Sequence, residues 1–174
     1  MKFNNDMLRL YAVTDRHWTG EQTLYEQVRD VLMGGATCLQ LREKDLDEAS
    51  FYEEAKNIKE LCRLFDVPFI INDNVMLAKE IDADGVHVGQ DDMACVKARE
   101  ILGPDKIIGV SAHTIEEARI AKEHGADYLG IGAIFPTSSK DDAEVLGIKR
   151  LKEMTETVDL PMVAIGGISY DNCL

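Results

Sequence analysis

The sequence has no stretch that would place the protein in a membrane or in an export pathway. Its first ten residues mix Lys2, Asp6 and Arg9 with apolar side chains, and nowhere do about 18 uncharged apolar residues follow one another. We therefore expect neither a signal peptide nor a membrane span. Low-complexity segments are absent too, and 45% apolar with 29% charged residues is typical of a globular protein. The length of 174 residues predicts one domain over residues 1–174.

Paired cysteines and basic side chains are also scarce. The four cysteines form no CxxC pair and no cluster with histidine at zinc spacing, so we expect a reduced, cytoplasmic protein. Nineteen basic against 32 acidic residues leave a formal charge of −13, which would repel nucleic acid and anionic membranes. Small-molecule partners remain, and any anion among them must be bound by a local cluster of positive charge. A homo-oligomer is compatible with this composition.

Short apolar runs that end in polar residues recur seven times along the chain, and we interpret them as strands. They are residues 8–15 (LRLYAVTD), 38–43 (CLQLRE), 68–73 (PFIIND), 85–90 (GVHVGQ), 107–113 (IIGVSAH), 128–136 (YLGIGAIFP) and 161–167 (PMVAIGG). The segments between them have helical spacing. Their apolar residues are Leu24, Val28, Val31 and Leu32 in the first, and Phe51, Ala55, Ile58, Cys62 and Phe65 in the second. A later helix is expected to begin at Thr114, with Glu117 completing a capping box.

This alternation of strands and helices, without a hairpin signal, predicts a parallel sheet. An open doubly wound sheet and a closed barrel both fit the alternation. The polar residues at the end of every strand favour the TIM (β/α)₈ barrel, in which all strands contribute to one mouth. Only seven strands are visible, and an eighth βα unit would need roughly 30 to 40 residues beyond Leu174. We therefore expect a C-terminally incomplete barrel whose first and last strands are unpaired edges.

Three polar residues alternate at the end of the second strand. Gln40, Arg42 and Lys44 share one face, while the leucines between them point to the other. In a barrel this polar face lines the lumen near the mouth, where two cations and an amide suit a phosphate or diphosphate. The alternative is an ion pair of these cations with Glu43 or Asp45 at a solvated strand end.

Carboxylates follow the third and fourth strands. Asp73 comes after Asn72, and the adjacent Asp91 and Asp92 come after the fourth strand. Hard oxygen ligands without histidine or cysteine suit Mg²⁺. The alternative is helix capping, by Asp73 or Asn74 before a helix that starts at residue 75, and by Asp91 or Asp92 before one that starts at residue 93. From spacing alone capping is the commoner role of such residues.

Phosphate-binding groups also follow the sixth and seventh strands. The loop after the sixth strand carries Thr137, Ser138, Ser139 and Lys140, whose hydroxyls and ammonium suit a phosphate. Gly130 and Gly132 before this loop are expected to leave space in the lumen. Gly166 and Gly167 end the seventh strand, where a bare backbone can approach a phosphate closely. A polar surface turn and plain turn glycines are the alternatives.

Ser111 and His113 invite comparison with a nucleophile and its base. They lie two residues apart with no evident acid to orient the imidazole, so we expect Ser111 to hydrogen-bond a ligand instead. His87 alternates with valines and is interpreted as a histidine of the lumen or core.

With these residues in place, the chain resembles the thiamine-phosphate synthase family over nearly its whole length. The matching motifs are LYAVTD (10–15), QLREK (40–44), IIND (70–73), GVHVGQDD (85–92), GVSAHT (109–114), GIGAIFPTSSK (130–140) and VAIGGI (163–168). Each motif alone is weak, but seven in the family's order, each ending a predicted strand, are specific. The departure is at the C-terminus, where the family continues with a helix and an eighth strand that complete its thiazole phosphate site.

The resemblance implies a (β/α)₈ barrel that joins hydroxymethylpyrimidine diphosphate to thiazole phosphate and releases pyrophosphate. By position, the residues for the pyrimidine diphosphate would be Gln40, Arg42, Lys44, Asn72, Ser111 and Lys140, and Arg42, Lys44 and Lys140 would support catalysis. Mg²⁺ would be held by Asp73 and Asp92, against the capping role that spacing favours. The thiazole phosphate would meet Thr137, Ser138, Ser139 and Gly167.

Two other functions remain open at this point. A barrel relative that tautomerises a thiazole phosphate would not need the diphosphate-binding residues of QLREK or two metal carboxylates, and their presence argues against it. A non-catalytic module that binds thiazole or thiamine phosphate, or an inactive fragment, would follow from the missing eighth unit.

Overall fold

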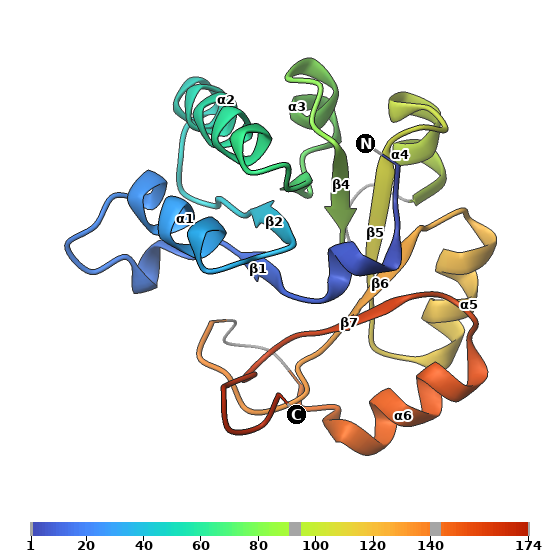
Figure 1. Cartoon of the computed structure of the whole chain (residues 1–174). Helices are drawn as coiled ribbons and strands as arrows, with labels where there is room; N and C mark the ends of the chain where they lie inside the picture. The colour runs from blue at the N-terminus through green and yellow to red at the C-terminus, as the bar shows by residue number, and fades with distance from the viewer. Residues whose placement is uncertain (1, 91–94, 140–143, 174) are drawn as a thin grey trace.

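The computed structural model describes residues 2–90, 95–139 and 144–173, and these form one seven-stranded sheet (Figure 1). The strands follow one another in chain order, and every neighbouring pair is parallel. They are β1 (Tyr11–Val13), β2 (Cys38–Leu41), β3 (Phe69–Asn72), β4 (Gly85–Val88), β5 (Ile107–Ala112), β6 (Tyr128–Ile131) and β7 (Met162–Ala164). The predicted parallel sheet is therefore confirmed.

Helices connect the strands on the outside of the sheet. They are α1 (Leu24–Met33), α2 (Glu48–Leu64), α3 (Val75–Glu80), α4 (Cys95–Leu102), α5 (Ile115–Glu123) and α6 (Gly147–Thr157), and 3₁₀ turns span Asn5–Leu8 and Arg16–Trp18. In the parts of the chain that the structure describes, none of the helices is both long enough and apolar enough to cross a membrane.

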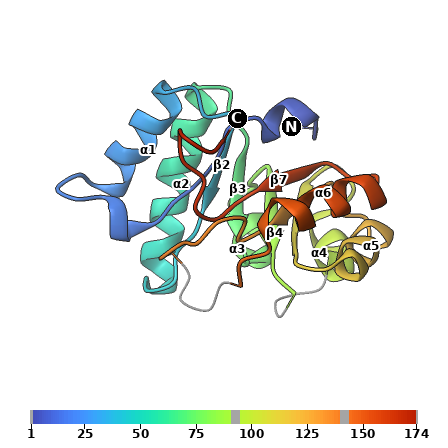
Figure 2. The same cartoon turned by 90° about the horizontal axis from the view of Figure 1, so that it is seen from below.

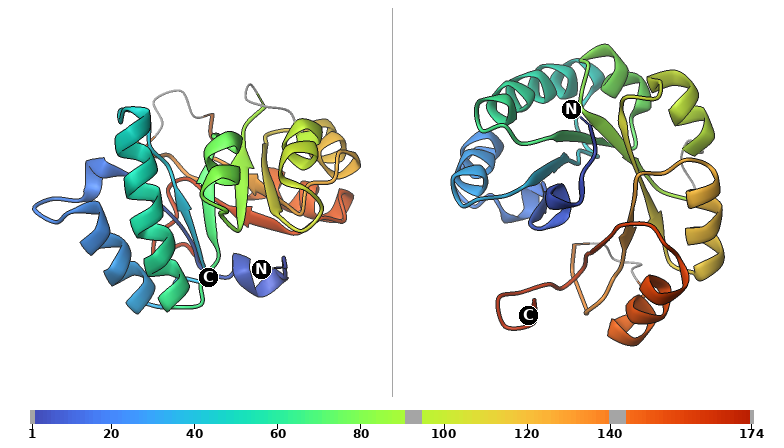
Figure 3. Two further views of the ribbon diagram at one scale, coloured as in Figure 1. Left: turned by 90° about the horizontal axis from the view of Figure 1, so that it is seen from above. Right: turned by 45° about the vertical axis from the view of Figure 1, so that its right-hand side comes forward.

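The sheet curls into a nearly closed barrel. Its helices form an outer arc that runs from α1 to α6 (Figure 3). In the view from below, α1 and α2 lie on one side of the molecule, and α5 and α6 lie on the other (Figure 2). β1 and β7 are the two edges of the sheet, as predicted. Strand ends differ from the sequence-based bounds, because residue 8 belongs to a 3₁₀ turn and β6 stops at Ile131. Beyond β6 the chain still pairs with the segment after β7, through Ile134 N and Ile165 O at 2.9 Å.

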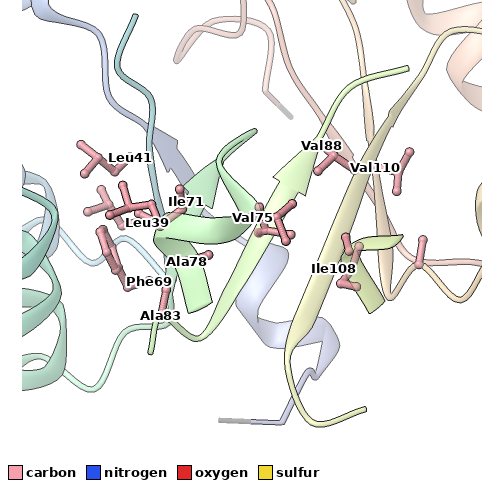
Figure 4. Close-up of a cluster of buried hydrophobic side chains, with 14 of the residues drawn as sticks. Leu39, Leu41, Phe69, Ile71, Val75, Ala78, Ala83, Val88, Ile108 and Val110 are labelled. Atoms are coloured by element: carbon pink, nitrogen blue, oxygen red, sulfur yellow. The ribbon is translucent and has the colours of Figure 1, made fainter. Parts of the chain in front are cut away.

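Alternate residues of each strand serve two different cores. The outer core lies between strands and helices and includes Leu39 and Leu41 of β2, which are 1% and 0% exposed (Figure 4). The inner core consists of Met7, Cys38, Ile70, Ile107 and Tyr128, and it fills the lumen at the N-terminal ends of the strands. Because the leucines face outward, the polar alternation of β2 faces the lumen.

The helices confirm most of the apolar pattern and correct one residue. Leu24, Val28 and Leu32 of α1 are buried, Val31 is half-buried, and the first four predicted core residues of α2 are buried. Phe65, predicted to face the core, is 39% exposed, because α2 ends at Leu64 and the chain turns away at Asp66 with φ of 56°.

The capping box expected at the start of α5 is half formed. The Thr114 hydroxyl accepts a hydrogen bond from Glu117 N at 3.1 Å, as expected. The Glu117 carboxylate accepts from the backbone N–H of His113 instead of that of Thr114. Thr23 and Glu26 form a complete capping box at the start of α1, which was not among the expected caps.

Side chains that immediately precede a strand lock the N-terminal end of the barrel. Asp84 Oδ2 accepts from Phe69 N at 3.0 Å, Asp127 Oδ2 accepts from Ile108 N at 2.7 Å, and Thr37 Oγ1 accepts from Leu10 N at 2.8 Å. In each case the donor lies at or beside the start of the preceding strand. The end of the barrel opposite the polar strand termini is thus fixed by repeated side-chain to backbone hydrogen bonds.

Candidate functional site

The end of β2 is hydrogen-bonded to the end of β1, and this fixes the backbone position of Arg42. Thr14, only 4% exposed, accepts a hydrogen bond from Arg42 N at 2.9 Å and donates to Arg42 O at 3.2 Å. Gln40 is buried in the lumen, whereas Arg42 is half-buried and Lys44 is exposed. The three side chains of QLREK therefore rise from the barrel interior to its rim, as their alternation predicts.

The ion pair offered as the alternative for these cations involves a different arginine. Glu43, whose side chain is 3% exposed, lies 2.8 Å from Arg16 Nε, and Arg16 also pairs with Glu54 of α2. Burial raises the pKa of Glu43, and the adjacent guanidinium opposes that rise. Among the described residues, Arg42 and Lys44 form no ion pair. Their charges are not neutralised there by a carboxylate.

At the end of β3, the structure shows which of Asp73 and Asn74 caps the following helix. Asn74 is the N-cap of α3 and accepts from Leu77 N at 2.9 Å. Asp73 therefore does not cap this helix. It adopts a left-handed backbone with φ of 63°, its N–H donates to His87 O, and its carboxylate accepts from Asn72 Nδ2 at 2.5 Å. Asn72 and Asp73 thus lie together at the rim between β3 and β4.

Several predicted positions lie outside the described residues. They are Asp91, Asp92, the expected helix start at residue 93, and Lys140. Within the described residues, no group of three or more His, Cys, Asp or Glu side chains is arranged to hold a metal ion. A magnesium site at Asp73 and Asp92 therefore stays a prediction.

The loops after β6 and β7 lie side by side. Phe135 N donates to Gly166 O at 3.0 Å, and a Cβ on Gly167 would come within 2.5 Å of Pro136 O. Gly166 and Gly167 both have positive φ, of 91° and 65°, so this close approach depends on glycine. The structure thus brings the loop that carries Thr137, Ser138 and Ser139 next to Gly167.

This double loop is braced at two further points. Thr137 Oγ1 accepts from Ser139 N at 3.2 Å, and Asn172 Nδ2 donates to Gly167 O at 3.0 Å. Thr137 is half-buried, while the hydroxyls of Ser138 and Ser139 are on exposed residues. Backbone N–H groups and hydroxyls collected in one loop pair are suited to an anion.

The space expected at Gly130 and Gly132 is already filled. A Cβ on Gly130 would lie 2.9 Å from His87 Cε1, and one on Gly132 would lie 2.4 Å from Ile165 O. The prediction that these glycines leave open lumen was therefore wrong. They are small because a histidine ring and a neighbouring backbone occupy the volume that a side chain would need.

Ser111 pairs with a different histidine from its sequence neighbour. Its Oγ lies 3.0 Å from His87 Nε2, and burial lowers the pKa of His87 to about 4. His113 turns away to Glu117, 3.4 Å from its Nδ1, so an acid does lie beside that imidazole. The Ser111–His113 nucleophile hypothesis is not supported by this geometry, and His87 is a lumen residue as predicted.

Three residues of the site region were not identified from the sequence. Thr14 holds the end of β2, and Tyr11 and Tyr128 connect Gln40 with His87 inside the barrel. The available signal was the spacing in LYAVTD, which places Tyr11 on an inward-facing position, but the partners come from distant strands.

Comparison with known proteins assigns the family. The sequence profile of thiamine monophosphate synthase matches residues 10–173. The thiamine-phosphate synthases of Clostridium acetobutylicum and Desulfitobacterium hafniense are 49% and 51% identical to the chain over 164 residues. The chain belongs to the thiamine monophosphate synthase family. These alignments cover 94% of the chain and 78% and 79% of the two relatives.

Solved structures agree with the family and with the fold. Thiamine phosphate pyrophosphorylase from Pyrococcus furiosus superimposes with a TM-score of 0.86 at 43% identity, covering 97% of this chain and 79% of that one. The 3-dehydroquinate dehydratase from Geobacillus kaustophilus reaches 0.65 at 11% identity, covering 90% and 72% of the two chains. The latter likeness concerns the barrel alone. The barrel and the family resemblance expected from the motifs are confirmed, and the family is one of transferases that form thiamine phosphate.

Proposed function

We propose that this chain is a cytoplasmic thiamine-phosphate synthase that joins hydroxymethylpyrimidine diphosphate to thiazole phosphate with the help of Mg²⁺. The observation that carries the proposal is the extent of the family match. It runs over residues 10–173 and so includes every candidate site residue from Gln40 to Gly167. Arg42 and Lys44, which form no ion pair among the described residues, agree with a site for a polyanion.

The chemistry asks for charge stabilisation more than for a nucleophilic side chain. The aminopyrimidine stabilises positive charge on its exocyclic methylene, so the C–O bond breaks and the diphosphate leaves with the electron pair. The thiazole nitrogen then forms the new C–N bond to that methylene carbon. In a partly dry barrel mouth, fixed positive groups stabilise the departing anion more strongly than they would in water.

We assign the two substrates to two sets of residues at the barrel mouth. Arg42, Lys44 and Lys140 would neutralise the departing diphosphate, and Gln40, Asn72 and Ser111 would orient the pyrimidine diphosphate. The thiazole phosphate would be bound by Thr137, Ser138, Ser139 and Gly167. The first set comes from β2, β3, β5 and the loop after β6, and the second set comes from the loops after β6 and β7, so the two substrates would meet beside the loop after β6.

Asp73 and Asp92 would hold the magnesium ion. Asp73 suits this role because its carboxylate is a hard oxygen donor at the rim, while Asn74 serves as the cap of α3. When bound, Mg²⁺ would supply positive charge against the developing charge of the diphosphate. The remaining positive charge would come from this chain's own Arg42, Lys44 and Lys140.

Replacing Asp73 with asparagine is expected to raise the Mg²⁺ concentration for half-maximal rate by about 10- to 100-fold. Asparagine tolerates the left-handed backbone at this position, so the change removes one charge without adding strain. Initial rates over a Mg²⁺ titration measure the effect. Asp66→Asn is the matched control, because exposed Asp66 has φ of 56° in the turn after α2, away from the strand ends of the mouth. Equal Mg²⁺ requirements for the two variants would contradict the assignment.

The overall proposal is tested by mixing the purified chain with both substrates and Mg²⁺ and measuring thiamine phosphate. We expect product only when both substrates are present. Binding of thiazole phosphate or thiamine phosphate without product would favour a non-catalytic module. Conversion of a thiazole phosphate tautomer without the pyrimidine substrate would favour the tautomerase alternative, and neither binding nor product would indicate an inactive fragment.

A further inference from the structure

Five polar side chains form a continuous hydrogen-bonded chain across the barrel lumen. Gln40 Nε2 donates to Tyr11 Oη at 2.8 Å, and Tyr11 Oη lies 2.6 Å from Tyr128 Oη. Tyr128 Oη lies 3.0 Å from His87 Nδ1, and His87 Nε2 lies 3.0 Å from Ser111 Oγ. The chain therefore joins β2, β1, β6, β4 and β5, and connects two residues assigned to the pyrimidine diphosphate.

Burial holds the side chains of this hydrogen-bonded row in place. Tyr128, Gln40 and His87 are 1%, 5% and 7% exposed. Burial raises the pKa of both tyrosines, so their hydroxyls stay protonated near pH 7. Among the described residues, the two ring nitrogens of buried His87 meet hydroxyl groups, and such a setting favours the neutral imidazole. A neutral imidazole has one donor nitrogen and one acceptor nitrogen, and the neighbours decide which is which.

Donor and acceptor counting gives the chain a direction. The Gln40 amide donates to Tyr11, which leaves the hydrogen of the Tyr11 hydroxyl available to Tyr128. In this forward direction Tyr128 would donate to His87 Nδ1, and His87 Nε2 would donate to Ser111 Oγ. In the reverse direction Tyr11 would accept twice, and its own hydrogen would be left with the Cys38 thiol, a weak acceptor. In the forward direction each tyrosine hydroxyl and each His87 ring nitrogen has a partner, and the hydrogen of the Ser111 hydroxyl is left for a ligand.

The lumen is shaped around these rings. A Cβ on Gly109 would lie 2.2 Å from Tyr128 Cζ and 2.5 Å from His87 Nδ1, and a Cβ on Gly130 would lie 2.9 Å from His87 Cε1. Any larger residue at these two inward positions would displace the tyrosine and histidine that carry the chain. At the far end, Gln90 Nε2 donates to Ser111 O at 2.6 Å and fixes the serine backbone.

We propose that Tyr128 is a positioning residue for the pyrimidine diphosphate: through His87 it sets Ser111 as a hydrogen-bond donor toward the substrate's phosphate oxygens. Tyr128 itself is buried in the inner core, at the N-terminal ends of the strands, and acts only through the His87 imidazole. The substrate part of this inference rests on the proposed function, whereas the direction of the hydrogen-bond chain does not.

The direction is tested by ¹⁵N–¹H correlation NMR of the histidine ring nitrogens in the protein, with His87 assigned through a His87→Gln variant. We expect the proton of His87 on Nε2 in the unmodified chain. Tyr128→Phe keeps the ring, which stacks on Phe3 with centroids 5.9 Å apart, and removes only the hydroxyl. We expect it to abolish this preference and give a mixture of tautomers. A proton on Nδ1 in the unmodified chain would overturn the proposal.

Kinetics test the action through Ser111. Tyr128→Phe is expected to lower kcat/KM for the pyrimidine diphosphate by about 3- to 10-fold, mainly through KM, as for the loss of one hydrogen bond. In the Ser111→Ala background the same change is expected to have no further effect. Multiplicative losses in the double variant would overturn the proposal. Tyr52→Phe, on the outer helix α2, is the matched control and is expected to leave kcat/KM unchanged.

These outcomes separate the positioning role from the proposed function. If the unmodified protein forms no thiamine phosphate, the proposed function is refuted, and so is the substrate part of this inference. The NMR experiment would still decide the direction of the hydrogen bonds from Gln40 to Ser111. Normal activity combined with unchanged His87 tautomers in Tyr128→Phe would refute the positioning role and leave the function intact.

Discussion

Replacing Arg42 with alanine is expected to lower the turnover of thiamine phosphate formation by about 100-fold or more. The guanidinium starts from a backbone that Thr14 holds through both its N–H and its carbonyl, so its position at the mouth is set before substrate arrives. Removing one such preorganised charge from a developing anion typically costs this much in rate. Steady-state kcat with both substrates saturating is the measurement, and Lys140→Ala, whose role rests on the family resemblance, is expected to behave in the same way.

The fold of Arg42→Ala should be unaffected, because among the described residues the Arg42 side chain forms no ion pair. Arg119→Ala serves as the control, since Arg119 is exposed on the outer helix α5 and the change removes the same charge from the chain. We expect it to retain normal turnover. A near-normal kcat for Arg42→Ala, or an equal loss for Arg119→Ala, would refute the assigned role.

The strands and their parallel order were predictable because each depends on a local pattern. An apolar run that ends in polar residues needs only its own side chains to be recognised, and a helix between two such runs forces them to be parallel. The errors lie at element ends, where one competing contact decides. Phe65 fits the helical spacing of α2, but the helix stops one residue earlier and leaves the ring 39% exposed.

At the site, local reasoning identified which residues gather at the rim but not which task each performs. Asp73 and Asn74 are equally good caps by spacing, and the left-handed backbone at Asp73 makes Asn74 the cap. Gly130 looked like open space because a sequence cannot show that the His87 ring fills it. These outcomes depend on backbone conformation and on neighbours from other strands.

The lumen chain was not predictable from local patterns for the same reason. Tyr11 and Tyr128 are 117 residues apart, and only closure of the sheet brings their hydroxyls within 2.6 Å. Each tyrosine by itself fits an apolar strand. Their polar role appears only when Gln40 and His87 are placed on either side of them.

The N-terminal end of the barrel is expected to determine stability without affecting the reaction, and Arg99 makes four hydrogen bonds there. Its guanidinium donates to Gly103 O, Lys106 O, Gly125 O and Asp127 Oδ2, at 3.1, 2.5, 2.9 and 2.9 Å. The same Asp127 oxygen accepts from Ile108 N at the start of β5. One side chain of α4 therefore joins two loops and the β5–β6 pair.

Arg99→Ala is expected to lower the free energy of unfolding by about 2 to 4 kcal/mol, because it leaves the partly buried carbonyls of Gly103 and Lys106 without this donor and removes the ion pair with Asp127. Urea unfolding measures the loss, and Arg99→Lys should fall between alanine and the unmodified chain, since lysine keeps the charge but not the planar fork. Arg150→Ala removes an exposed ion pair with Glu153 and is expected to cost less than about 1 kcal/mol. Equal losses for the two alanine variants would show that Arg99 is an ordinary surface arginine. Because Arg99 lies at the N-terminal ends of the strands, kcat of the folded Arg99→Ala variant should stay normal. This result would show that one end of the barrel stabilises the fold and the other end binds substrate.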